Sequence, residues 1–368
     1  MKWYNRAMID DSGHRKKIWP ALSAVKFVCL AVLIFVHAHV ALVTNSGVFV
    51  NPFGIFYKIT SNLMYLGLFL IALPIIAGAV LRMDLDKGFI QDKLKNDYRL
   101  GGIIKIATFL SLAGFFMNMI TFGIGYTFSW NVLQLIGLSF IVIVFLLKKF
   151  SVRAVGWFGL AVLLVADPLR NILGNWDHLY FVGIFIGVHN AFIFWPFFPW
   201  FGVVVFGFLV AHYYLKYQDS VKFRVGLFAA GAILLSLAVS RGEASPYLDP
   251  NYVWGPSIFQ PKIGWVLAAL GLFCLLVVVA NTFLNNSRFS KYGIINSYSK
   301  GILWIYVAQM FASQKLSWLV KDFFPMDEPS LAYFILPVVL LGLGWLIGAL
   351  SIRFLQEKSI VIKLKRTQ

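Results

Sequence analysis

The chain has 368 residues, of which 60% are hydrophobic and 13% are charged, and its mean hydropathy is +0.79. No water-soluble domain can bury so much apolar surface, so the composition excludes a soluble protein and indicates an integral membrane protein. Lys and Arg (32) outnumber Asp and Glu (15), which gives a net charge of +17. Most of these basic residues flank apolar segments, so we expect no nucleic-acid partner.

Apolar segments long enough to cross a bilayer recur along the whole chain. We predict an all-α, polytopic protein of about ten transmembrane helices, at residues 20–43, 55–81, 101–122, 131–147, 152–169, 198–215, 223–240, 262–284, 300–320 and 330–353. They would form one domain over 1–368, with a cytoplasmic segment at 1–19 and a basic cytoplasmic tail at 356–368. The first apolar run has no clear cleavage site and is expected to remain as a helix. Cys29 and Cys274 lie in apolar segments and indicate neither a disulfide nor a metal site.

The basic residues predict the orientation of these helices. With the N-terminus in the cytoplasm, 24 of the 32 Lys and Arg lie on the cytoplasmic side, in the segments 2–17, 82–99, 148–153, 216–224, 288–300 and 353–366. Six lie on or near the outer side, and two, Lys26 and Lys105, lie within the membrane. Cytoplasmic loops carry an excess of Lys and Arg, so this asymmetry predicts ten crossings with both termini in the cytoplasm.

The segment LYFVGIFIGVHNAFIFWPFF (179–198) is apolar enough to form an eleventh helix. An eleventh crossing would invert every later loop and place the basic C-terminal region outside. We therefore predict a re-entrant or interfacial element on the outer side. Non-helical backbone at membrane depth is tolerated only where protein or a water-filled cavity covers it, so this segment is a candidate wall of a pocket.

Two ionisable residues, Lys26 and His37, lie in the first apolar segment. Eleven residues at about 100° each return a helix to within roughly 20° of its start, and place them roughly 16 Å apart along one face. The ordinary interpretation is that Lys26 extends to the interface and His37 bonds a neighbouring helix. The functional one is a cation that holds an anionic donor and a histidine that acts as base or nucleophile. His39 points away by about 200° and is a weaker candidate.

The stretch SAVKFVCLAVLIFVH, with ten residues between Lys26 and His37, resembles the first helix of membrane-bound acyltransferases of family 3, which carry an Arg and a His at this spacing. Three stretches resemble the related bacterial heparan-α-glucosaminide N-acetyltransferase-like group: WNVLQLIGLSFIVIVFLL (130–147), FWPFFPWFGVVVFGFLVAHYY (194–214) and YSKGILWIYVAQMF (298–311). Lys26 stands in place of the family's Arg. Gln309, three residues after Tyr306, stands where the last motif usually has a His.

The resemblance implies an integral membrane transferase of the bacterial inner membrane. It would move an acyl group, expected to be acetyl, from coenzyme A on the cytoplasmic side to a sugar on the far side. His37 would be the catalytic residue, and Lys26 would lie on the donor side. Acetyl-CoA would be the donor substrate, with no metal, in a membrane-lipid environment. The oligomeric state is left open.

Other polar residues become candidates within this scheme. Basic side chains could neutralise the phosphates of coenzyme A, and we assign this role to Arg82, Arg99 and Lys105. Carboxylates, amides and aromatic faces suit sugar recognition, and the acceptor-binding candidates are Gln134, Asp177, His189, Asn190 and Trp200. The ordinary alternatives are membrane anchoring for the basic residues, an interhelical hydrogen bond for Gln134, and interfacial or loop positions for the others.

Two other functions remain open from the sequence. A transporter or flippase would also have about ten helices with buried polar residues, although inverted repeats and paired broken helices are not evident. An inactive family member is the second alternative, because Lys26 and Gln309 depart from the family pattern. Binding of acetyl-CoA would distinguish the transferase from both.

Overall fold

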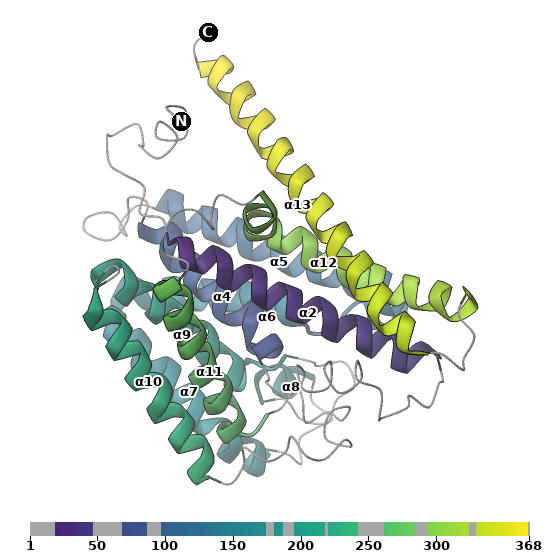
Figure 1. Ribbon diagram of the computed structural model, residues 1–368. Helices are drawn as coiled ribbons and strands as arrows, with labels where there is room; N and C mark the ends of the chain where they lie inside the picture. The colour runs from purple at the N-terminus through teal and green to yellow at the C-terminus, as the bar shows by residue number, and fades with distance from the viewer. Residues whose placement is uncertain are drawn as a thin grey trace.

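Helices account for nearly all of the chain that the computed structural model describes, which comprises residues 19–46, 68–86, 97–173, 180–186, 195–217, 220–241, 261–283, 293–323 and 329–366. In chain order they are α2 (Pro20–Ser46), α4 (Leu68–Asp86), α5 (Asp97–Phe122), the 3-10 turn η1 (Ile124–Tyr126), α6 (Val132–Lys149), α7 (Val152–Leu173), α8 (Tyr180–Ile186), α9 (Phe197–Tyr217), α10 (Val221–Ser240), α11 (Ile263–Phe283), α12 (Gly293–Phe323) and α13 (Pro329–Arg366) (Figure 1).

Each predicted span overlaps one of these helices in the same order, although only 68–81 of the predicted 55–81 belongs to the described residues. Within the described residues, eight helices are long and apolar enough to cross a membrane. The protein is therefore an all-α, polytopic membrane protein. The largest difference is α13, whose 38 residues continue to Arg366, through the residues predicted as a tail. Figure 1 shows this helix extending beyond the rest of the bundle.

Burial separates inner from outer helices. In α9 and α11, 72% of the spanning residues are buried, against 22% in α10 and 28% in both α7 and α13. The outer helices expose large apolar side chains, such as Trp157, which is 72% exposed. A water-soluble protein would not leave such surfaces uncovered, so these helices face lipid. α9 and α11 form the interior of the bundle.

The helices approach one another closely where glycine removes the side chain. The most extensive contact joins α4 to α9. A Cβ atom built on Gly78 would lie 1.9 Å from the carbonyl oxygen of Val204, and one built on Gly207 would lie 1.9 Å from that of Ile75. Small residues at helix crossings allow this kind of backbone contact in membranes. Only glycine fits at either position without displacing a helix.

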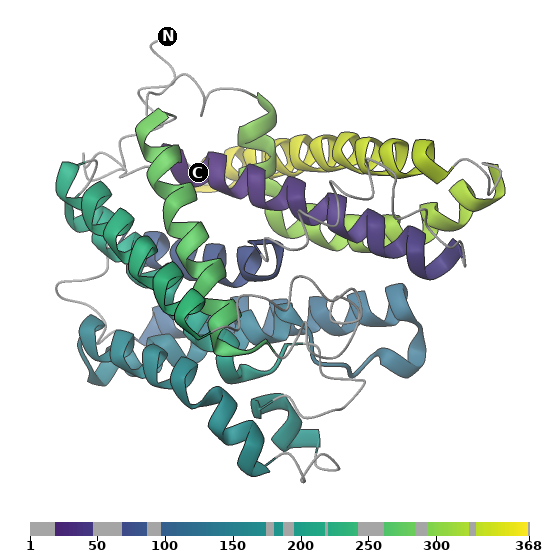
Figure 2. The same ribbon diagram turned by 60° about the horizontal axis from the view of Figure 1, so that its bottom comes forward.

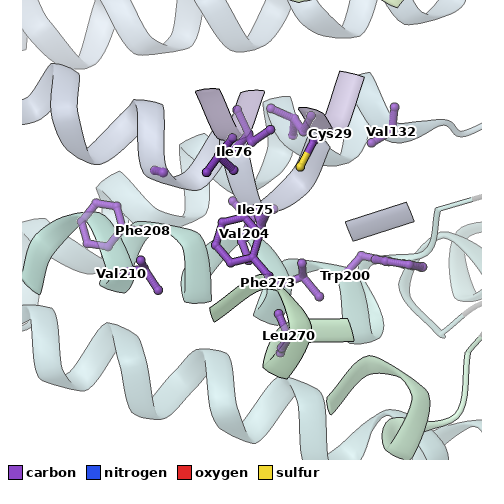
Figure 3. Packing of buried hydrophobic residues seen from close by; sticks show 14 of the residues in the cluster. Cys29, Ile75, Ile76, Val132, Trp200, Val204, Phe208, Val210, Leu270 and Phe273 are labelled. Atoms are coloured by element: carbon purple, nitrogen blue, oxygen red, sulfur yellow. The ribbon is translucent and has the colours of Figure 1, made fainter. Parts of the chain in front are cut away.

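The first helix, α2, connects two groups of helices. It contacts α12 and α13 on one side, and α4 and α11 on the other, and Figure 2 shows it beside α12 and α13. Figure 3 shows Cys29 of α2 near Ile76 of α4, with Val204 and Phe273 deeper in the same core. These side chains are all at most 3% exposed. His37 is therefore carried on a helix that is held from several directions.

Pairs of contacts give the relative directions of neighbouring helices. Ser299 donates to Ser23 at 3.1 Å near the start of α2, and Gln309 contacts His37 fourteen residues further along α2, so α2 and α12 run parallel. Ten crossings predict this arrangement, because α2 is the first and α12 the ninth. A further crossing within 179–198 would make them antiparallel.

The segment 179–198 contains only one helix in its described part, the 7-residue α8. A helix needs about 20 residues to cross a bilayer, so α8 does not span it. Residues 187–194 lie outside the described chain. The predicted re-entrant form of this segment stays a prediction.

Different interactions join the helices at the two ends of the bundle. At one end, Trp19 stacks on Tyr214 with ring centroids 4.3 Å apart, and its indole Nε1 donates to Asn281 Oδ1 at 2.9 Å. At the other end, Arg170 donates to Asp167 at 3.2 Å and to the backbone carbonyls of Ile186, Pro261 and Phe198 at 2.9, 3.0 and 3.1 Å. Arg170 therefore joins the ends of α7 and α8 to the starts of α9 and α11.

Candidate functional site

His37 lies within the bundle and contacts one polar side chain of α12. The distance between its Nδ1 atom and the amide Nε2 of Gln309 is 2.7 Å. Gln309 is only 3% exposed, and its carbonyl oxygen Oε1 is buried without a hydrogen-bond partner. An unpartnered buried polar atom is costly, so it marks a place where the geometry serves something other than stability. Gln309 is the residue that fixes the His37 ring.

Tyr306 lies one helical turn before Gln309 and completes this group. Residues three apart on a helix share a face, so both side chains point from α12 towards α2. The centroid of the Tyr306 ring is 6.3 Å from that of His37, and the tyrosine is 5% exposed. The site therefore consists of a histidine from α2 and a tyrosine and an amide from α12.

A cavity of about 480 Å³ adjoins this group. It lies between α4, α5, α6 and α12, and Tyr306 forms part of its wall. The other described lining residues include Ala77, Ile106 and Ile136, and Asp84 is the charged one among them. Tyr306 contacts His37 and also lines the cavity, so the tyrosine ring lies between the cavity and the histidine.

Lys26 lies on α2, about 16 Å before His37 along the helix axis. It is partly buried. The following residue, Phe27, packs edge-on against Tyr298 of α12, with ring centroids 5.1 Å apart. α2 and α12 thus stay together from Lys26 to His37, and the two polar residues lie along one helix pair.

The comparisons with known proteins identify the family of the chain. The family model described as heparan-alpha-glucosaminide N-acetyltransferase, catalytic, matches residues 19–248. The chain belongs to this family. No curated protein and no solved structure gives a match. The matched region contains Lys26 and His37 but ends before α11, so Tyr306 and Gln309 lie outside it.

Membership in the heparan-alpha-glucosaminide N-acetyltransferase family confirms the resemblance seen in the sequence and indicates a membrane acetyltransferase. It also favours a transferase over a transporter. The matched region of this chain comprises α2 to α10.

The donor-side candidates lie in different surroundings. Arg82 is 3% exposed and faces α9, where its Nε donates to His212 Nδ1 at 3.2 Å and its guanidinium lies 6.0 Å from the centroid of the Phe208 ring. Lys105 is exposed on α5. Arg99 belongs to α5, and its side chain lies outside the described part. The structure therefore brings Arg82 to α9 and leaves Lys105 on the surface of the bundle.

Gln134 caps the start of α6. Its Oε1 accepts from the backbone N–H of Asn131 at 3.0 Å, and its Nε2 donates to the carbonyl of Ser129 at 3.2 Å. Asn131 in turn bonds the backbone of Leu133 and the side chain of Asn118. This is a capping box, which satisfies N–H groups at the helix start. The geometry gives Gln134 a capping role at the start of its own helix, and the contacts to α5 are made by Asn131, which bonds Gly114 and Asn118.

Trp200 lies in the core at the start of α9. It is 0% exposed and packs on Trp195 and Trp265, with ring centroids 4.5 and 6.4 Å away. The other three acceptor-side candidates, Asp177, His189 and Asn190, lie outside the described residues. Of the predicted acceptor set, none is brought next to His37 by the part of the chain that the structure describes.

The sequence identified neither Gln309 nor Tyr306 as a site residue. It showed Gln309 only as a departure from a motif that contains Tyr306. The signal was present, because Gln309 is a polar residue in the apolar run LWIYVAQMF. Polar residues inside membrane helices usually face the bundle and bond a neighbouring helix. The sequence alone did not show that the face of α12 with Tyr306 and Gln309 packs against His37 of α2.

Proposed function

We propose that this protein transfers an acyl group, with acetyl as the first candidate, from cytoplasmic acyl-CoA to a sugar on the outer side of the membrane. The observation that carries the proposal is the contact between the partly buried His37 and the buried Gln309, in a chain of the heparan-alpha-glucosaminide N-acetyltransferase family. A histidine held in the membrane interior by one amide is arranged for acid–base or nucleophilic chemistry.

His37 has two ways to promote the transfer. As a base, Nε2 takes the proton of the acceptor's hydroxyl or amine while that group attacks the thioester carbonyl, the C–S bond breaks, and coenzyme A leaves as a thiolate that gains a proton. As a nucleophile, Nε2 attacks the thioester first and then passes the acyl group to the acceptor. Both routes need a lone pair on Nε2, so the proton must be on Nδ1.

Lys26 would hold the donor. An ammonium group near the cytoplasmic end of α2 attracts the phosphates of coenzyme A without the paired geometry that an arginine would impose. The roughly 16 Å between Lys26 and His37 leaves room for an extended pantetheine arm between the two. We expect Lys26→Arg to keep donor binding and Lys26→Ala to weaken it.

The test uses purified protein and radiolabelled acetyl-CoA, with release of free coenzyme A as the readout. His37→Ala should lower turnover by about 10²–10⁴-fold, as expected for loss of a general base or nucleophile. It should leave the KM for acetyl-CoA nearly unchanged, whereas Lys26→Ala should raise that KM. Retained label on wild-type protein that His37→Ala abolishes would indicate the nucleophilic route.

The control for folding is the melting temperature of each variant, which should match that of the wild type. The proposal fails if the wild-type protein binds neither acetyl-CoA nor palmitoyl-CoA and releases free coenzyme A from neither. It also fails if His37→Ala turns over at the wild-type rate.

A further inference from the structure

The cavity beside Tyr306 has walls that do not match the polar parts of either proposed substrate. Among the lining residues that belong to the described part of the chain, only Asp84 and Tyr306 carry polar side chains, and the others are aliphatic or aromatic, with one glycine. The amides of a pantetheine arm or the hydroxyls of a sugar would lose their hydrogen bonds to water here. An unpaired amide or hydroxyl in an apolar site costs a few kcal/mol, on the order of 1–3.

The volume of the cavity also suits a ligand larger than an acetyl group. A volume of about 480 Å³ is within the range of roughly 300–1,000 Å³ that holds whole small ligands. An acetyl group alone would leave most of it empty. A flexible aliphatic chain would fill it and bury apolar surface against apolar walls.

The cavity has an open side and a closed end. Gly102 and Ile106 of α5 line it and are exposed, Ile106 at 52%. Tyr306, which is 5% exposed and faces His37, lines it from α12. A chain could therefore enter past α5 and reach Tyr306, the residue that contacts His37.

We propose that this cavity binds the aliphatic chain of one of the two substrates. The inference rests on the proposed function and narrows its substrate class. The chain is either an acyl group longer than acetyl, carried by coenzyme A, or the hydrocarbon tail of a lipid-linked sugar acceptor. Both present the same chemistry to these walls, and the experiment separates them.

The neighbouring glycines of α5 provide a matched pair of variants. A Cβ atom built on Gly102 meets nothing within 4 Å, and the same is true for Gly101. Gly102 lines the cavity and Gly101 does not. Gly102→Phe should therefore obstruct the cavity, while Gly101→Phe adds the same side chain one position away. Ile106→Trp provides a second obstruction at the same opening.

Photo-cross-linking gives a readout that needs no turnover. The probes are palmitoyl-CoA with a diazirine near the end of its chain, and a polyprenyl-phosphate sugar with a diazirine in its tail. We expect one of them to label peptides of α4, α5, α6 or α12 in the wild type. Gly102→Phe should reduce that labelling about tenfold, equivalent to about 1.4 kcal/mol of binding free energy, because its side chain would occupy space that the bound chain needs. Gly101→Phe should leave it unchanged.

The outcomes are distinct. Labelling by palmitoyl-CoA assigns the cavity to the donor's acyl chain, and labelling by the lipid-linked sugar assigns it to the acceptor. The inference is overturned if neither probe labels these helices, or if Gly101→Phe and Gly102→Phe lose labelling equally. His37→Ala should still be labelled, so failure of catalysis and failure of this inference can be told apart.

Discussion

His37 can act as a base only through the ring nitrogen that Gln309 does not contact. When the amide NH₂ of Gln309 donates to Nδ1, as the 2.7 Å contact has it, Nε2 carries the proton and is a donor. When the amide turns by 180° and presents Oε1, Nδ1–H donates and Nε2 is free to accept a proton. Because Oε1 has no partner in its present position, no other hydrogen bond opposes this turn.

Substitutions of Gln309 test this positioning role. Gln309→Leu removes the partner of Nδ1 and should lower kcat by about 10–100-fold, the range found when a metal-binding histidine loses the partner that orients its ring. The KM for acyl-CoA should change little, because Gln309 lies beside the histidine and not at the donor end of α2. Steady-state kinetics of acetyl transfer measure both constants.

Gln309→Glu is the informative companion to that change. A carboxylate can only accept from Nδ1–H, so it holds the tautomer in which Nε2 is free. We expect this variant to keep most of the wild-type kcat. Equal losses in Gln309→Leu and Gln309→Glu, with matching falls in melting temperature, would mean that Gln309 only supports the fold.

At this scale the sequence predicted the histidine but not its surroundings. Lys26 and His37 were identifiable because ionisable residues stand out in an apolar helix. Gln134 stands out in the same way, yet its side chain closes a capping box at the start of α6. A polar residue in a membrane helix must find a partner, and the sequence does not say whether that partner is a substrate or the backbone.

At the scale of single elements, glycine determines how closely the helices pack. Gly78 and Gly207 face the backbone carbonyls of the opposite helix at the α4–α9 crossing. Replacing Gly78 with leucine would place side-chain atoms where the α9 backbone lies, and no rotamer avoids this because the Cβ atom itself clashes. α4 and α9 would have to separate.

We therefore expect Gly78→Leu to destabilise the protein strongly, by at least about 3 kcal/mol, the upper range for overpacking a core. Gly226→Leu is the matched control, because a Cβ atom at Gly226 meets nothing within 4 Å. Thermal unfolding in detergent, followed by exposure of the buried Cys29 and Cys274 to a thiol-reactive dye, would measure both. Equal melting temperatures would contradict the close contact.

The sequence predicted the elements well in number and less well in length. Hydropathy defines where a helix must be apolar, so the predicted 198–215 and 262–284 differ by one or two residues from α9 and α11. It does not define where a helix ends in water. α13 is apolar enough to span only over Ile335–Arg353, yet its hydrogen-bonded backbone continues to Arg366.

At the scale of the whole molecule, the directions of the helices constrain the topology. α2 and α12 run parallel, and so do α4 and α9, since Ile75 lies at Gly207 and Arg82 bonds His212 further along both helices. Two helices are parallel only when an even number of crossings separates their starts. This relation was not available from hydropathy, which gives an eleventh apolar segment the same weight as the others.

Reporter fusions after Gly125, Ser220 and Gln368 test the orientation that the basic residues predict. Gly125 lies in η1, between α5 and α6, and should be outside. Ser220, between α9 and α10, and Gln368 should be inside, because Lys216, Lys222 and Arg224 adjoin the first and the basic residues of α13 precede the second. Alkaline phosphatase should be active only after Gly125, and green fluorescent protein should fluoresce only at the other two sites.

Ser220 is the decisive position among the three. With ten crossings its phosphatase fusion is inactive, whereas a crossing within 179–198 would carry Ser220 outside and make that fusion active while Gly125 stayed the same. Active phosphatase after Ser220 would thus overturn the ten-crossing topology and place the start of α12 outside, whereas Lys26 would stay on the cytoplasmic side because the fusion after Gly125 fixes the direction of α2. An inactive fusion there, with an active one after Gly125, places the start of α2 and of α12 in the cytoplasm, where acyl-CoA is made.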